Sequence, residues 1–432
     1  MAIPRSELHQ ITEPGNFCWA TGIEDTFITD PWPATGRTLD EYELTGHYER
    51  WREDLDLMAQ LGVKTARYGI PWHRIQPEPD RWDWTWADGP IERMLELGIA
   101  PILDLVHYGL PPWIEGAYLH PDFHLLMGEY ARGVAERFRG RVRWYTPLNE
   151  PRITAWYCGK LGWWPPYRRG WRGFVAVMLG LSRGIVQAGR AIQGVDPENV
   201  LVHVDATDVY SAREPEYEAE AERRQQIGFL ALDLASGRVT RDHPLRDWLH
   251  QSGATNSDLE WFQSHFVPLD VVGLNMYPMF SRKRLVRSPR GLRVQMPYAT
   301  PEIVEQLVRL YWEQYGRPMM ITETAARGTF QRRRAWLDGS VAAIGRLRAE
   351  GYPIVGYTWW PMFALVAWAY RQGRRPASDY LEQMGLWNLD PDPEQCLRRV
   401  PTPLVEAYRE LAEGGSRAVG PLSTERPAQG RG

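Results

Sequence analysis

Polar side chains stand at the ends of apolar runs at several points along this chain. The clearest cases are Asn149 and Glu150, which follow VRWYTPL, and Glu323, which follows PMMIT. Other apolar runs contain or end in further polar or aromatic groups: Arg67, His107, Asn275, Tyr277, Trp359 and Trp360. A buried polar group without a partner costs about 1–3 kcal/mol, so core packing explains this pattern poorly. It indicates one site to which several segments contribute.

The two glutamates predict a specific chemistry. Two carboxyl groups that face one anomeric carbon suit glycoside hydrolysis, because one protonates the leaving oxygen and the other attacks the carbon. The acid needs a pKa raised by burial and by its partner's charge, while the nucleophile must stay ionised, which a nearby Arg67 would favour. Since Pro151 disfavours the helical region for the residue before it, we expect an extended backbone at Glu150.

The elements that must position these residues alternate along the chain. Short apolar runs, which we interpret as buried strands, lie at 17–21, 63–70, 99–109, 142–150, 199–206, 269–277, 318–323 and 353–361. Helix-like segments separate them, at 47–62, 88–98, 123–138, 174–193, 216–236, 256–264, 301–316 and 334–351, and a last one lies at 402–413. Eight such units predict an α/β fold, a single closed (β/α)8 TIM barrel, whose site lies at the carboxyl ends of the strands.

We expect one catalytic domain over residues 1–413 and a flexible C-terminal tail over 414–432, which is rich in glycine, proline and polar residues. No glycine-rich phosphate-binding fingerprint follows the first strand, which argues against a nucleotide-binding sheet.

Composition excludes several functional classes. The net charge of −4 gives no reason to expect nucleic acid or an anionic membrane as a partner. No run of about 18 uninterrupted apolar residues and no secretory signal is found, so we expect a cytoplasmic protein. Three widely separated cysteines argue against a zinc site or a disulfide framework. The 21 tryptophans fit either a core rich in tryptophan or a site that stacks sugar rings.

Seven motifs, in order from about residue 17 to 413, resemble those of glycoside hydrolase family 1, the retaining β-glucosidase type. TPLNEP resembles T-x-N-E-P, ITETA resembles I-T-E-N-G, and RYGIPWHRIQP resembles R-F-S-x-x-W-x-R-I-x-P. LVHYGLPPWI, GLNMY, GYTWWPMFALVAW and MGLWNLD resemble the family's L-x-H-W-D-L-P, G-x-N-Y-Y, G-Y-x-x-W-S-L-L-D-N-F-E-W and F-G-L-x-x-V-D.

This resemblance implies a role for each matching residue. It makes Glu150 the acid/base and Glu323 the nucleophile. It implies substrate binding by Arg67, His107, Asn149, Asn275, Tyr277, Trp360 and Trp368, and a cis peptide bond between Trp360 and Pro361. It implies a small-molecule glycoside as partner and requires no metal or cofactor; it leaves the oligomeric state open.

The departures from the family pattern concern the sugar. The second sugar-gripping glutamate of the family falls on Ala367, and the glutamine of the first strand has no clear counterpart, although Glu24 and Asp25 are nearby. The lysine and tyrosine of enzymes that act on 6-phosphosugars are also missing. Arg371, Arg374 and Arg375 could meet an acidic substituent or lie in a solvated loop. We therefore expect atypical glycone recognition, of a modified sugar or a glycosylated small molecule.

Two alternatives stay open. The same covalent intermediate could be captured by an alcohol, which would make the protein a transglycosylase. The loss at Ala367 also fits a non-catalytic sugar-binding protein on a decayed barrel. Several of these residues have a structural alternative as well: an ion pair for Arg67, Glu150 and Glu323, a core histidine for His107, a turn for Asn149, and core packing for Trp360 and Trp368.

Overall fold

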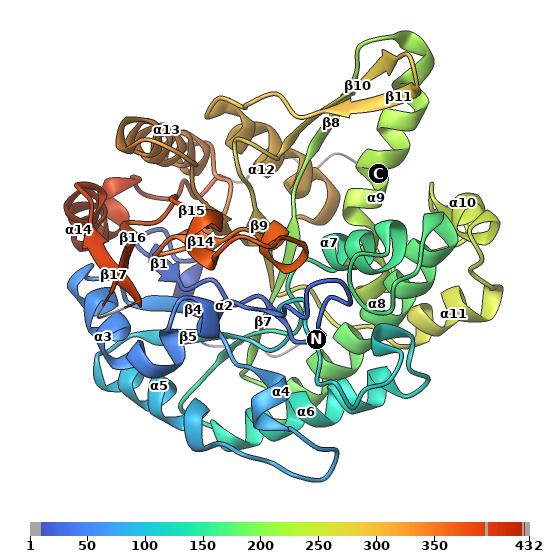
Figure 1. Cartoon of the computed structure of the whole chain (residues 1–432). Coiled ribbons are helices and arrows are strands. Elements are labelled where there is room, and N and C mark those ends of the chain that lie inside the picture. The colour runs from blue at the N-terminus through green and yellow to red at the C-terminus, as the bar shows by residue number, and fades with distance from the viewer. Residues whose placement is uncertain (1–9, 394–395, 426, 428–432) are drawn as a thin grey trace.

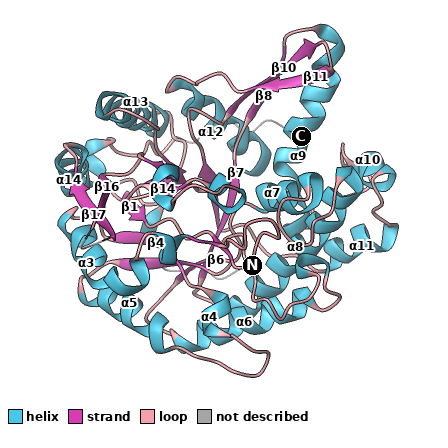
Figure 2. Cartoon of the chain, viewed as in Figure 1, coloured by secondary structure: helices cyan, strands magenta, loops and turns pink. Residues whose placement is uncertain are grey.

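The computed structural model describes residues 10–393, 396–425 and 427. Its centre is a closed barrel of eight parallel strands, in the order β1-β13-β12-β9-β7-β6-β5-β4, with helices around it (Figures 1 and 2). The barrel strands are β1 (Cys18–Gly22), β4 (Thr65–Gly69), β5 (Ala100–Asp104), β6 (Trp144–Thr146), β7 (Val200–Ala206), β9 (Val271–Asn275), β12 (Met319–Thr324) and β13 (Ile354–Trp359). The predicted barrel is confirmed.

The helices cover the outside of the barrel. The longer ones are α3 (His47–Gln60), α5 (Thr85–Glu96), α6 (Phe123–Arg137), α8 (Gly170–Val195), α9 (Glu218–Ala235), α11 (Asn256–Ser264), α12 (Glu302–Tyr315), α13 (Phe330–Ala349) and α14 (Leu404–Gly414). The shorter ones are α2 (Glu41–Leu44), α4 (Trp72–Ile75), α7 (Pro151–Ala155) and α10 (Arg246–Gln251), with a π-helical turn at Trp156–Leu161. Each predicted helix corresponds to one of the longer helices, because their apolar stripes are the strongest local signal.

Small sheets that the sequence analysis did not predict decorate the barrel. They pair β2 (Phe27–Ile28) with β3 (Leu39–Asp40), β14 (Leu365–Val366) with β15 (Leu381–Glu382), and β16 (Trp387–Asp392) with β17 (Cys396–Pro401). A three-stranded sheet joins β8 (Val209–Ala212), β10 (Arg282–Ser288) and β11 (Gly291–Gln295), and it projects beside α9 at the top of Figure 1.

Two layers of apolar packing hold the barrel. The interior is filled by apolar side chains from the strands, most of them small or branched: Ala20, Ile102, Val200, Val202, Val204, Val271, Met320 and Val355. The larger layer lies between the strands and the helices and contains most of the buried aromatic residues. A filled interior closes the barrel below and leaves only its upper rim free to form a site.

By length and composition, α8 could cross a membrane, but 72% of its most apolar window is buried inside the protein. The core helix of a folded barrel passes the same test. Residues of α8 pack against α6 and α9, so its apolar surface has a partner within the described part of the chain.

The first part of the segment that we predicted as a flexible tail makes contacts with the rest of the chain. Gly415–Ala418 form a 3-10 helix, and the Gly415 carbonyl accepts a hydrogen bond from the indole of Trp19 at 2.9 Å. Val419 and Leu422 are buried, and the Leu422 amide donates to the Pro14 carbonyl at 3.1 Å. Val419 belongs to the apolar layer outside the strands, so this part of the chain packs against the barrel, which composition alone did not indicate. Residues 426 and 428–432 lie outside the described part.

A candidate glycosidase active site

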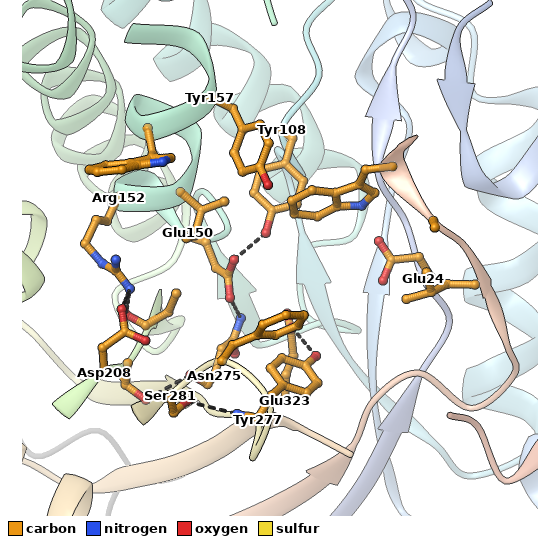
Figure 3. Close-up of a pocket in the computed structure, with 18 of the residues that line it drawn as sticks. Glu24, Tyr108, Glu150, Arg152, Tyr157, Asp208, Asn275, Tyr277, Ser281 and Glu323 are labelled. Atoms are coloured by element: carbon orange, nitrogen blue, oxygen red, sulfur yellow. Dashed lines mark hydrogen bonds and ion pairs between the residues drawn. The ribbon is translucent and has the colours of Figure 1, made fainter. Parts of the chain in front are cut away.

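One cavity of about 480 Å³ opens at the carboxyl ends of the barrel strands (Figure 3). Glu150 follows β6, and Glu323 is the fifth residue of β12, on the other side of the barrel. Both side chains line the cavity, with 7% and 4% of the residue surface exposed. The strands therefore bring two nearly buried carboxyl groups, 173 residues apart in the sequence, to a common space.

The backbone at Glu150 is not extended, which corrects the prediction. Its φ of 43° and ψ of 62° place it in the left-handed region, at the N-cap of α7. Pro151 begins that helix at the position where its fixed φ is tolerated. A left-handed conformation at a non-glycine residue costs about 1–3 kcal/mol and persists only where the surroundings impose it. Here it turns the carboxyl group into the cavity.

Two donors hold the Glu150 carboxyl group. The phenol of Tyr108 donates to Oε2, and Asn275 Nδ2 donates to Oε1 at 2.8 Å. Burial and the charge of Glu323 raise the pKa of Glu150 to about 7, although both hydrogen bonds act in the opposite direction. A carboxyl group with this pKa can be protonated near neutral pH and can exchange its proton during a reaction.

Glu323 has a more strongly cationic surrounding. Arg67 Nη1 donates to its Oε1, and the phenol of Tyr277 donates to its Oε2 at 2.7 Å. Burial raises the pKa of Glu323, but the charges of Arg67 and His107 oppose that rise. The fixed guanidinium beside it favours the ionised form, so the two glutamates have environments that suit different protonation states.

Arg67 and His107 connect the two glutamates to other buried acidic residues, Asp25 and Asp104. Arg67 Nη2 donates to Asp104 at 2.5 Å and to Asn149 Oδ1 at 2.6 Å. His107 Nδ1 lies 2.5 Å from Asp25 Oδ1 and 3.1 Å from Asp104. The ligand atoms of Asp25, Asp104 and His107 lie within 4.8 Å of one another, the spacing of a metal site. Because the Arg67 guanidinium already bonds Asp104, these acids hold cationic side chains, and the geometry gives no argument for a metal.

The comparisons with known proteins agree with this arrangement. The family model described as glycosyl hydrolase family 1 matches residues 20–332. That match covers more than half of the chain and includes Glu150 and Glu323.

The chain belongs to glycosyl hydrolase family 1.

Similar proteins of known name support the assignment. A bifunctional β-D-glucosidase/β-D-fucosidase of Bifidobacterium breve is 27% identical, covering 84% of this chain and 89% of that protein. β-Glucosidase A of Thermotoga maritima is 24% identical, covering 78% and 82%. The structure of a family 1 β-glucosidase from Thermotoga maritima in complex with isofagomine lactam has a TM-score of 0.78 at 21% identity, covering 94% and 99%. The last likeness supports the barrel fold alone.

The other residues predicted from the sequence divide into two groups. His107, Asn275, Tyr277 and Trp368 line the cavity of this family 1 protein. Arg67, Asn149 and Trp360 lie behind the wall, with at most 1% of their surface exposed. A direct contact of these three with a sugar stays a prediction, while their contacts with wall residues are visible.

Trp360 connects both groups. Its ring stacks on His107, with centroids 5.9 Å apart, and the Arg67 guanidinium lies 4.9 Å from its centroid. Its indole N–H donates to Glu24 Oε2 at 3.1 Å. The Trp360–Pro361 bond is cis, as predicted.

Arg371 does not face the cavity as an anion receptor. It is 1% exposed, and its guanidinium donates to the Asp30 and Trp163 carbonyls and to the Tyr167 phenol. Its role is to hold loops together at the rim, which corrects the interpretation of this residue as a contact for an acidic substituent.

Sequence reasoning missed several residues of the cavity wall. The sequence places Tyr108 within a family-like motif and Glu24 after the first strand, but it indicates a specific role for neither. Glu24 is 6% exposed, and its Oε1 accepts a hydrogen bond from Thr26 at 2.6 Å. In the sequence, Glu24 and Asp25 form a pair of acidic residues after the first strand. Charged residues at a position that is expected to be buried suggest a functional role. Besides Glu24, the cavity wall includes Leu365, Ala367, Glu382 and Met384.

Proposed function

We propose that this family 1 glycoside hydrolase cleaves a β-glycosidic bond with retention of configuration, with Glu150 as acid/base and Glu323 as nucleophile. The contrast between the two carboxyl environments supports this assignment most directly. Glu150 has a pKa raised to about 7, and Glu323 is bonded to the Arg67 guanidinium. The acid needs the first property and the nucleophile needs the second.

The proposed reaction has two displacement steps. In the first, a Glu323 oxygen bonds to the anomeric carbon, the glycosidic bond breaks, and the proton of Glu150 passes to the leaving oxygen. In the second, Glu150 takes a proton from water, the water oxygen bonds to the anomeric carbon, and Glu323 leaves as carboxylate. Arg67 and Tyr277 orient the nucleophile and stabilise its negative charge at the start and at the end. We expect a separation of about 5–5.5 Å between the two carboxyl groups when a substrate is bound.

We further propose that the glycone is held differently from an ordinary glucoside. Ala367 leaves space where the family glutamate would bind outer hydroxyl groups, and Leu365 and Met384 add apolar surface beside it. Glu24 provides a carboxylate at this end, and a carboxylate can only accept hydrogen bonds. A sugar that presents donors to Glu24 and an apolar or enlarged substituent to Ala367 would fit this wall. A modified sugar or a glycosylated small molecule meets both conditions.

Covalent labelling tests the assignment of the nucleophile. We expect a 2-deoxy-2-fluoro β-glycoside from a panel of glucose, galactose, fucose and amino-sugar derivatives to add its glycosyl mass to the peptide that contains Glu323. Glu323→Gln is the matched control, since it removes the nucleophile at constant side-chain volume, and it should abolish the label. Absence of label across the whole panel would instead favour a sugar-binding protein without activity.

A second test addresses Glu150 and the fate of the intermediate. Glu150→Ala should slow hydrolysis, and azide should restore turnover and give a β-glycosyl azide. Full activity of this variant would refute the assignment. Product analysis in the presence of an added alcohol separates hydrolysis from transglycosylation, because only the latter converts most of the substrate to a new glycoside.

The glycone proposal has its own test. A hydrogen bond to a charged group contributes about 1.5–3 kcal/mol, so Glu24→Ala should lower kcat/KM by roughly tenfold to a hundredfold on the preferred glycoside. Glu24→Gln, which can still accept one hydrogen bond, should lose less. If neither change affects the ranking of sugars in the panel, Glu24 does not bind the glycone.

A further inference from the structure

A group of charged residues lies at the side of the cavity opposite to Glu24. Figure 3 shows Arg152 and Asp208 beyond Glu150, while Glu24 lies on the other side of the carboxyl pair. If Glu24 marks the glycone end, the Arg152 side is where the leaving group lies. Lys283 also lines this part of the cavity. The roles proposed above leave this group of residues unexplained.

The positive groups here are held in place but not fully used. Arg152 Nη2 lies 2.6 Å from Asp208 Oδ2 and donates to the Ala206 carbonyl at 2.9 Å. Arg152 Nε is buried and has no hydrogen-bond partner among the described residues. Lys283 Nζ lies 3.4 Å from the same Asp208 oxygen, and its side chain is 17% exposed. One carboxylate therefore faces two cations.

The neighbouring acids do not cancel the second cation. Asp205 lies behind Arg152, but burial raises its pKa to about 8, so that it is mostly uncharged at pH 7. Glu220 is also close to these cations, but it forms ion pairs with two other arginines. Its Oε2 pairs with Arg223, and its Oε1 lies 2.7 Å from Arg224 Nε. The set of Arg152, Lys283 and Asp208 therefore has one more positive than negative charge. The same is true of the set of Arg223, Arg224 and Glu220.

The strand that carries Lys283 extends this positive region. Residues 282–295, which form β10 and β11, contain six basic side chains and no acidic one, in a chain of net charge −4. Arg287 is paired with Glu216 at 2.6 Å, whereas Arg284 and Arg293 are exposed. Lysine is also rare in this chain, which has arginine at nearly all of its basic positions. The hairpin places a positive field over the leaving-group side of the cavity.

Apolar side chains form the rest of this wall. Ile153 and Trp156, from the segment that follows Glu150, line the cavity together with Phe280 and Met296. Phe280 and Met296 are 41% and 54% exposed, which is unusual for large apolar residues and leaves their surface free to cover a ligand. An aromatic or similarly flat apolar body fits between such walls.

We propose that the leaving group of this glycosidase is an apolar, ring-containing alcohol with an anionic oxygen group, a carboxylate or a phosphate, that binds to Lys283 and Arg152. This inference rests on the proposed function, because it identifies the leaving group of that reaction. Lys283 offers its remaining ammonium protons, and the guanidinium of Arg152 behind it adds a second positive charge. Asp208 holds the two cations at the wall and prevents them from reaching Glu150 or Glu323, where they would change the catalytic pair.

Direct binding of free leaving-group analogues tests this proposal without requiring catalysis. The probes are 4-hydroxybenzoate and 4-hydroxyphenyl phosphate, with the uncharged methyl 4-hydroxybenzoate as their neutral counterpart, titrated calorimetrically into the full-length protein. We expect at least one anionic probe to bind at least tenfold more tightly than the neutral ester. Lys283→Met, which removes the charge and keeps an unbranched apolar side chain, should remove this preference.

Arg293→Met is the matched control, because it deletes one charge from the same hairpin at an exposed position outside the cavity wall. It should leave the preference for the anion unchanged. Equal binding of charged and neutral probes, equal loss in both variants, or no binding of any probe would overturn the proposal. Covalent labelling of Glu323 is independent of Lys283, so labelling without anion preference refutes this inference alone, and absence of labelling refutes the proposed function.

Discussion

Removal of the Tyr108 phenol oxygen should move the pH profile of the enzyme toward higher pH. Tyr108 donates a hydrogen bond to Glu150 Oε2, and its carbon skeleton packs against Trp164 and Trp368. The Tyr108→Phe change deletes only the donor. The φ of 67° at this residue is strained for both side chains alike, so the backbone has no reason to change.

The sign and size follow from the hydrogen bond. A donor stabilises the charged carboxylate and so lowers the pKa of Glu150, which burial and Glu323 have raised to about 7. Hydrogen bonds to charged groups contribute about 1.5–3 kcal/mol, and one pKa unit corresponds to about 1.4 kcal/mol. Without the phenol, the pKa of Glu150 should rise by about 1–2 units.

The assay is the dependence of kcat/KM on pH for an aryl β-glycoside with a poorly acidic phenol, because only such a leaving group needs the proton of Glu150. Activity falls as pH rises through the pKa of the acid, since the acid loses its proton. This descending limb, near pH 7 in the wild type, should lie about 1–2 units higher in Tyr108→Phe. Tyr157→Phe is the matched control, because it removes a phenol oxygen from the same cavity, while the hydrogen bonds to Glu150 come from Tyr108 and Asn275.

Three outcomes would contradict this reasoning. An unchanged limb would mean that Glu150 is not the acid whose ionisation limits the rate. A limb shifted toward lower pH would mean that protonated Glu150 donates to the phenol, so that the hydrogen bond stabilises the neutral acid. An equal shift in Tyr157→Phe would attribute the effect to the general polarity of the cavity.

Other predictions concern stability away from the catalytic pair. Arg399→Met should lower the free energy of unfolding in urea by about 3–5 kcal/mol with an unchanged pH profile, because it leaves Asp54, bonded at 2.8 and 2.9 Å, without its guanidinium. Gly109→Ala should reduce both the melting temperature and kcat, since a Cβ there would lie 1.5 Å from the Phe27 carbonyl oxygen; an unaffected variant would show that the loop is not held this closely. Burial lowers the pKa of His203 from 6.5 to about 4, so the unfolded chain binds more protons between these values, and stability should fall as pH drops from about 6.5 to about 4. His203→Gln should flatten that part of the stability curve, and an identical curve would assign the acid sensitivity to other groups.

The sequence by itself predicted the barrel and the two glutamates that the fold brings into one cavity. Strands such as β9 and β12 are short, continuous apolar runs, and helices such as α12 have an apolar stripe of helical period. These signals are local, because burial on both faces of a strand or on one face of a helix imposes a composition on neighbouring positions. The barrel then brings Glu150 and Glu323 to the same rim, and the resemblance of the motifs around them implies their roles.

The backbone at Glu150 shows where local rules fail. A proline after this residue disfavours one region of backbone space, and an extended conformation was the natural expectation. The tertiary structure selects the left-handed region instead, because Glu150 must turn its carboxyl group into the cavity directly before the chain enters α7 at Pro151. The hydrogen bonds to the Glu150 carboxyl come from residues 42 and 125 positions away.

Only the tertiary structure decided which charges meet. Arg67 bonds Glu323 across 256 residues, and Trp360 bonds Glu24 across 336. The two-residue strands are too short to show a period, and β10 and β11, which bring Lys283 to the cavity, are rich in basic residues and lack the apolar run of a barrel strand. The closure of the barrel determines which residue pairs with each buried charge. A local sequence pattern cannot predict which distant strand end will face that charge. For that reason the reaction class could be read from the sequence, whereas the environment of each group and the chemistry of the leaving-group wall required the folded chain.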